Sequence, residues 1–225
     1  AKMTNIKIDQ IIRSKRKTLS LEITHDARLI VRAPKAASFS YIEKFIVEKR
    51  LWIQDKQKMV KERYVQSQPK KFVNGEEFLY LGDTLRLYIV ESDLPFLFYQ
   101  GFYLSRAYLA EARQMFINWY KQEAYKKIKE RVDLYSNLSG LKYNKFSITN
   151  AQKRWGSCSA KNNLCFSWRL VMFPLHVIDY VVIHELAHIE EKNHSQRFWN
   201  KVKIIIPNFK ESRRWLRENG YLSVV

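Results

Sequence analysis

Three histidines and a glutamate lie close together in the last quarter of the sequence. His184 and His188 are four residues apart, and Glu185 directly follows the first of them. On a helix the two imidazoles would project from one face, one turn apart, because residues i and i+4 are neighbours there. Two imidazoles at that separation can bind one metal ion, with the glutamate beside them as a proton acceptor. This is the H-E-x-x-H pattern of zinc hydrolases.

His194 is the candidate third ligand. It follows His188 with five residues between them. The polar run at 190–193 ends the apolar pattern, and Asn193 is of a type favoured where a helix ends. Ser195 is a good N-cap for a second helix. We therefore expect His194 in the corner between two helices, where it can turn back towards the metal.

The segments around the histidines have the apolar spacing of helices. Pro174 suits the first turn of the earlier helix, since its missing N–H is not needed there. Apolar residues then recur near helical spacing and give that helix a buried face. They are Ile178, Val181, Val182, Leu186 and Ile189 in the first helix, and Phe198, Trp199, Val202 and Ile205 in the second.

The two cysteines fall on a predicted hairpin. Residues 154–159 and 164–168 have strand character, with a turn at 160–163. A two-residue loop would place Cys158 opposite Cys165. The pair could then be metal ligands, a redox pair or ordinary thiols. Six intervening residues are not a usual zinc-knuckle spacing, which favours reduced thiols.

The rest of the chain alternates between strand and helix patterns. The predicted elements are strands within residues 5–33 with a turn at His25-Asp26-Ala27, a long helix from Ser38 to about Tyr64, strands within 72–104, and a helix from Ser105 to about Tyr135. We therefore expect an α+β fold with two domains. Residues 1–104 would form a basic, β-rich domain with a long helix, and residues 105–225 would carry the histidines.

The chain is strongly basic, with a formal net charge of +18. Residues 1–71 hold 18 basic and 7 acidic residues, so the excess is greatest in the N-terminal part. The cluster Arg13-Ser14-Lys15-Arg16-Lys17 would be either a solvated strand edge or a phosphate contact. The charge makes DNA or another polyanion a candidate partner of this half.

From composition and hydropathy we expect a cytoplasmic protein. With 46% hydrophobic residues, the chain is globular in composition and not disordered. No apolar run approaches the ~20 residues of a membrane-spanning helix, so no membrane association is expected. Residues 1–5 contain no apolar core of a secretory signal. Two cysteines without such a signal fit a reducing compartment.

Several stretches together resemble the YgjP-like (DUF45) metallopeptidases, which are related to the SprT-like and WLM zincins. They are the basic cluster at 13–17, Trp155-Gly156-Ser157-Cys158, and His184-Glu185-Leu186-Ala187-His188 with Asn193-His194-Ser195 and Phe198-Trp199. The resemblance covers nearly the whole chain. It implies that His184, His188 and His194 bind one zinc ion and that Glu185 is the catalytic base. It also implies a zincin-like catalytic half, in which a small sheet packs on helices and an edge strand lies above the metal.

The hairpin from Arg154 to Trp168 is our candidate for that edge strand. An extended peptide could add to it through backbone hydrogen bonds, which would bind substrate with little regard to sequence. Arg154, Trp155 and Gly156 are therefore candidate substrate-binding residues, and Arg154 or a nearby tyrosine could stabilise the oxyanion. A tight bend that needs Gly156 only for packing is the equally open alternative.

The expected reaction is zinc-dependent hydrolysis of a peptide bond. Three neutral imidazoles leave the ion its full charge, which lowers the pKa of bound water towards ~7. Glu185 would take the water's proton and pass it to the leaving amine. Two alternatives remain. One is a nucleic-acid-binding protein with a structural zinc, which would need a cysteine as fourth ligand. The other is a metal-dependent hydrolase of a non-peptide amide.

Overall fold

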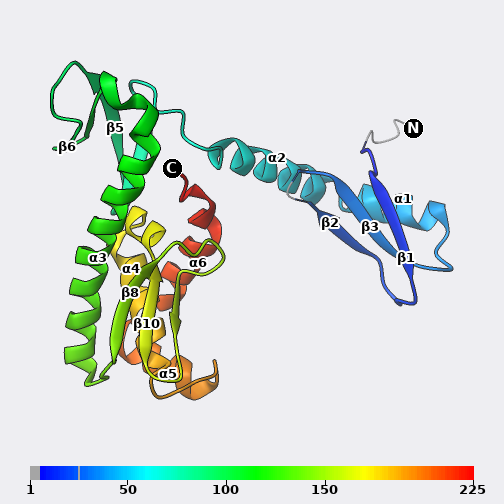
Figure 1. Ribbon diagram of the computed structural model, residues 1–225. Coiled ribbons are helices and arrows are strands. Elements are labelled where there is room, and N and C mark those ends of the chain that lie inside the picture. The colour runs from blue at the N-terminus through cyan, green and yellow to red at the C-terminus, as the bar shows by residue number, and fades with distance from the viewer. Residues whose placement is uncertain (1–5, 25) are drawn as a thin grey trace. The chain divides into compact units, whose positions relative to one another are not determined.

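The computed structural model describes residues 6–24 and 26–225, which divide into two compact units, Ala1–Gln68 and Pro69–Val225 (Figure 1). The boundary expected after residue 104 lies earlier, because the strands before that point pack on the helix after it. The Phe78 and Phe102 rings lie 4.4 and 4.8 Å from the ring of Phe116. The expectations for residues 1–5 and for His25 fall outside the described residues.

The first unit is built on a three-stranded sheet, as the strand patterns predicted. Its strands are β1 (Gln10–Ser14), β2 (Ser20–Ile23) and β3 (Leu29–Pro34). Central β3 runs parallel to β1 and antiparallel to β2. Alternate residues of β3 are buried, and α1 (Phe39–Glu48) contributes buried isoleucines to the same core. These core residues are Leu29, Val31, Ala33, Ile42 and Ile46.

The structure has two helices where one long helix was predicted, so the prediction of a continuous helix was wrong. Lys49, with φ −93° and ψ 11°, separates α1 from α2 (Arg50–Gln66). Ser38 caps α1, because its Oγ accepts a hydrogen bond from the backbone N–H of Tyr41. Beyond the break, α2 buries only Ile53.

The second unit begins with a four-stranded sheet in the order β4-β5-β7-β6. The turn between β4 and β5 is Leu81-Gly82, and both residues have positive φ, 52° and 92°. Two such residues form the tight turn whose twist matches antiparallel strands. The strands are β4 (Glu77–Tyr80), β5 (Asp83–Val90), β6 (Phe96–Phe98) and β7 (Phe102–Ser105).

The sheet packs on α3 (Ala112–Ser139), which follows a short 3-10 helix, η1 (Arg106–Glu111). The structure thus confirms the helix predicted here but starts the α-helical part later. Every fourth residue of α3 is buried, so one stripe of the helix faces the core. Gly140 ends the helix with φ 74°, a left-handed conformation that glycine adopts without strain.

The last part of the chain is the predicted small sheet packed on helices, which confirms the α+β class. The sheet has the order β8-β10-β9, so β9 (Gly156–Cys158) is an edge strand. The other elements are β8 (Lys145–Thr149), β10 (Asn163–Ser167), η2 (Trp168–Met172), α4 (Leu175–Ala187), α5 (Gln196–Ile205), α6 (Phe209–Asn219) and η3 (Gly220–Leu222). Among the described residues, no helix is both long enough and apolar enough to cross a bilayer.

Candidate metal centre

The first two histidines lie at the end of α4, the central helix of the second unit. Ten of its 13 residues are buried, so its position is fixed by packing on all sides. It is also tied to α3 by an ion pair with two hydrogen bonds. Arg131 Nε and Nη2 donate to the two carboxylate oxygens of Asp179, at 2.6 and 2.8 Å. The helix can therefore hold its terminal side chains in a defined place.

The helix ends earlier than the apolar pattern predicted. Its last residue is Ala187, and His188 is the C-cap with φ −67° and ψ −11°. The N–H groups of Ile189 and Glu191 then donate to carbonyl oxygens of the last helical turn. These turns satisfy helix-end carbonyls that have no partner within the helix. The expected exit at Asn193 was thus too late, but His184 and His188 keep their one-turn separation.

The three histidines converge as predicted. One ring nitrogen from each of His184, His188 and His194 lies within 4.8 Å of the other two. The Nε2 atoms of His184 and His194 are 2.9 Å apart. Nδ1 of His188 lies 2.9 Å from the carbonyl oxygen of Glu191. A carbonyl can only accept, so Nδ1 carries the proton and Nε2 keeps its lone pair free for a metal.

The loop before α5 positions His194. Ser195 is the N-cap, and its Oγ accepts a hydrogen bond from the N–H of Phe198. Asn193 also contributes, because its Oδ1 accepts from the N–H of Ser195 at 3.2 Å. The His194 ring stacks against Trp199, with centroids 5.6 Å apart and an interplanar angle of 26°. The cap and the stacking together turn His194 back towards α4.

The surroundings of His184 and His194 favour the neutral forms of these two imidazoles. Burial, together with the smaller effects of the charges of His188, His194 and Arg213, lowers the pKa of His184 to about 3. Burial and the same neighbours also lower the pKa of His194. Neutral imidazoles present lone pairs, and three of them are a donor set that suits Zn²⁺. The residues present therefore fit a zinc ion.

Glu185 is held against the edge strand. Its side chain is only 6% exposed, and a Cβ added at Gly156 would lie 2.6 Å from its Cγ and 2.7 Å from its Oε1. Only glycine permits this approach of β9 to α4. Burial raises the pKa of Glu185 to about 7, and the positive charge of Arg154 acts in the opposite direction. A carboxyl group in this range can both accept and release a proton near neutral pH.

A small cavity of about 160 Å³ opens beside His184 and Glu185. Trp155 and Gly156, two of the predicted substrate-binding residues, line it. Arg154 does not, although its charge reaches Glu185. The remaining lining residues are Tyr180, Val181 and Leu216.

Tyr180 was not singled out from the sequence. Its ring centroid lies 5.9 Å from that of His184. It precedes His184 by four residues on the same helix, so the i, i+4 spacing was a signal that could have found it. Burial raises the pKa of the Tyr180 phenol, which therefore keeps its proton near neutral pH.

The cysteines are not opposite each other, so that expectation was wrong. Cys158 pairs with Leu164, and Cys165 pairs with Ser157. The loop contains one more residue than assumed, and its last residue, Asn162, has φ 56°. A one-residue change of register moves a side chain to the other face of the sheet. Among the described residues, the histidine cluster includes no cysteine.

Replacing both cysteines by serine is therefore expected to leave metal binding intact. Cys165 Sγ contacts Ser147 Oγ at 2.9 Å, and burial raises the pKa of the Cys158 thiol, so neither is a ready thiolate ligand. The Cys158→Ser/Cys165→Ser variant should bind one zinc ion per chain, as the wild type does, with an affinity changed less than about threefold. Metal analysis and a competition titration with a chelating dye would measure this. Loss of zinc from the variant would instead indicate a closed, structural site.

The basic N-terminal cluster has partly structural contacts. The guanidinium of Arg13 donates to the carbonyl oxygens of Pro34, Lys35 and Ala37, which closes the loop after β3. Arg16 donates to the hydroxyl of Ser20. Lys15 and Lys17 are exposed. These two lysines are the members of the cluster that are free to meet a polyanion.

Comparison with known families agrees with this geometry. The family model described as "YgjP-like, metallopeptidase domain" matches residues 17–219. The match includes the histidine cluster, Glu185 and the edge strand β9. Comparisons with curated proteins and with solved structures find no match.

Proposed function

Because the chain belongs to the YgjP-like metallopeptidase domain family, we propose that it is a zinc-dependent peptidase with one zinc ion. His184, His188 and His194 would hold the ion, and Glu185 would be the general base. The observation that carries this proposal is the convergence of three imidazoles beside a buried carboxyl group. Three histidine ligands leave a coordination position open, as catalytic zinc sites require.

When bound, a zinc ion supplies Lewis-acid chemistry, since it acidifies water and polarises a carbonyl group. The chain's own residues handle the proton and the substrate. Glu185 accepts a proton from water in the cavity and delivers it to the leaving amine. Its burial keeps bulk water from competing for that proton. Tyr180, which also lines the cavity, would donate a hydrogen bond towards the substrate carbonyl.

The edge strand is the proposed binding site for the peptide backbone. β9 pairs with β10 on one side, and its other side is the end of the sheet. An extended peptide can add to such an edge in register with the strand. Gly156 and Trp155 on this edge line the cavity beside Glu185, so an added peptide would pass the catalytic group. Contact between the N-terminal half and DNA remains a prediction. Lys15 and Lys17 of the basic cluster at residues 13–17 are the residues that would make it.

The proposal is tested by removing and restoring the metal. Zinc-loaded protein should cleave an unfolded protein, and a chelator should reduce cleavage to background. One equivalent of Zn²⁺ per chain should restore it, because three ligands converge at a single site. Metal analysis, gel-based cleavage and circular dichroism of the chelated protein would be measured together. The last of these shows whether the fold survives without metal.

Two results would favour the alternative functions. Cleavage of small amides but not of unfolded proteins would identify a hydrolase of non-peptide substrates. One bound zinc with no hydrolysis of either class, and loss of the fold on chelation, would identify a structural zinc. Failure to bind zinc at all would contradict the proposal at its base.

A further inference from the structure

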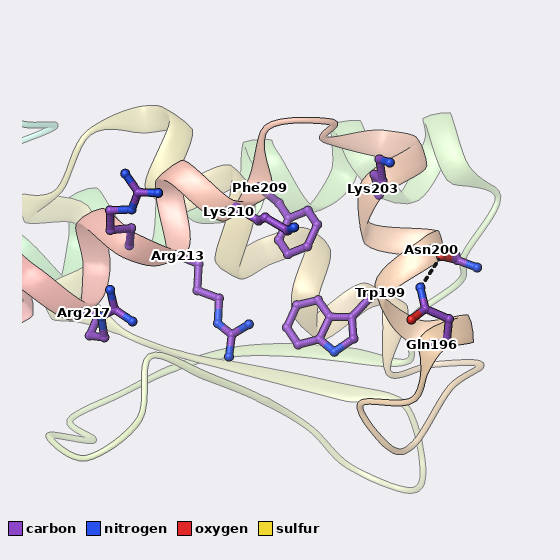
Figure 2. A pocket seen from close by; sticks show the side chains of 9 residues that line it. Gln196, Trp199, Asn200, Lys203, Phe209, Lys210, Arg213 and Arg217 are labelled. Atoms are coloured by element: carbon purple, nitrogen blue, oxygen red, sulfur yellow. Dashed lines mark hydrogen bonds between the residues drawn. The ribbon is translucent and has the colours of Figure 1, made fainter.

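A basic groove lies between α5 and α6 (Figure 2). Its volume is about 620 Å³, and no carboxylate lines it. Five cationic side chains line the groove. Lys203 comes from α5, and the other four come from α6: Lys210, Arg213, Arg214 and Arg217. All five are exposed. Such a groove has the charge and openness to hold an extended anionic ligand.

Within the described part of the chain, four of these five charges have no carboxylate partner. Arg217 approaches Glu218 at 3.7 Å, whereas no carboxylate pairs with the other four. The α6 members are spaced three and four residues apart, which places them on one face of the helix. Like charges at that spacing destabilise a helix. An anionic ligand would relieve this repulsion.

Trp199 connects the groove to the metal centre. It lines the groove, and its ring lies 5.6 Å from that of His194 and 5.9 Å from that of His184. Arg213 extends from α6, and its guanidinium lies 4.8 Å from the centre of the Trp199 ring (Figure 2). A ligand in the groove would therefore continue towards the ligand histidines.

The aromatic residues of the groove argue against a nucleic acid as its ligand. Trp199 and Phe209 stack on each other, with centroids 5.2 Å apart and an angle of 13°. Phe209 is buried, and Trp199 also contacts Arg213 and His194. Single-stranded nucleic acids are bound by stacking their bases on open aromatic faces. Carboxylates, by contrast, need only the cations, and arginine binds them with two parallel hydrogen bonds.

We propose that this groove binds an acidic segment of the polypeptide substrate, adjacent to the bond that is cleaved. The assignment rests on the proposed peptidase function. Arg217 lies seven positions after Lys210, which is about 10 Å along a helix. An extended peptide covers that length with about three residues. The groove thus suits substrates with several Asp or Glu residues in close succession.

Direct binding tests this assignment without relying on cleavage. The zinc-loaded Glu185→Gln variant would be titrated against a fluorescent peptide rich in Asp and Glu, and against its Asn/Gln counterpart, by anisotropy at low salt. The acidic peptide should bind at least about tenfold more tightly, from several exposed charge pairs acting together. Adding Lys210→Glu/Arg214→Glu should remove that advantage. The matched control Lys121→Glu/Lys142→Glu changes the net charge equally at exposed positions outside the groove and should keep it.

The outcomes separate this assignment from the peptidase function itself. Equal binding of the two peptides, or equal losses in the two charge-reversed variants, would overturn the groove assignment. Tighter binding of a single-stranded oligonucleotide or of inorganic triphosphate, lost with Lys210→Glu/Arg214→Glu, would overturn it in favour of a phosphate ligand. Selective acidic-peptide binding, with no cleavage by the wild type, would support the groove as a peptide site and contradict the peptidase proposal alone.

Discussion

Replacement of Glu185 by glutamine is expected to abolish peptide cleavage while one zinc ion stays bound. Glutamine has nearly the shape of glutamate, so it fits the space against Gly156, but it cannot accept a proton from water. Loss of a general base lowers the rate by about 10²–10⁴-fold. The three histidines do not change, and the metal should therefore remain. Zinc per chain and the rate of cleavage of an unfolded protein would be measured on the same sample.

Glu130→Gln is a suitable control for this variant, because it removes the same charge from an exposed position on α3. Its activity should equal that of the wild type. Undiminished cleavage by Glu185→Gln would exclude Glu185 as the base. Loss of zinc from Glu185→Gln would show instead that the carboxyl group helps to hold the metal.

Gly156→Ala is expected to lower cleavage by about 10²-fold or more, because a displacement of about 1 Å in a catalytic group can cost that much. The new Cβ would lie 2.6 Å from Glu185 Cγ, 2.7 Å from Oε1 and 2.9 Å from Cδ. Either the carboxyl group or β9 must then move. The buried surroundings of Glu185 leave it little room. Initial rates, zinc content and thermal unfolding of the variant would be compared with the wild type.

The zinc content of Gly156→Ala should equal that of the wild type, because Gly156 lies next to the base and the clash does not involve a ligand atom. Ser157→Ala is the neighbouring control. It removes only a hydroxyl from the next residue of β9, whose side chain points to the opposite face of the strand, and its activity should change little. Full activity of Gly156→Ala would show that β9 does not position Glu185.

The features that the sequence predicted correctly depend on short-range geometry. His184 and His188 share a helix face because the α-helix repeats every 3.6 residues, whatever surrounds it. Ser195 caps α5 through a hydrogen bond to a residue three positions later, which is also local. The convergence of His194 on the pair follows from these two facts. The helix that carries His184 and His188 ends earlier than predicted, but this did not change the predicted ligands, because their spacing is local.

Predictions failed where a long-range arrangement decides the outcome. One extra loop residue sends Cys158 and Cys165 to different faces, and no local pattern fixes the loop length. The break at Lys49 interrupts a helical pattern that continues on both sides. The unit boundary at residue 68 follows from packing of phenylalanines that are distant in sequence.

The sequence alone therefore determined the candidate ligands, the candidate base and their helix, because residues within one turn constrain each other through the backbone. Only the tertiary structure decided how the site is completed. It brings Gly156 from a distant strand against Glu185, and it places the cations of α6 beside Trp199. Contacts between separate elements depend on how their surfaces pack, and spacing along the chain does not encode that.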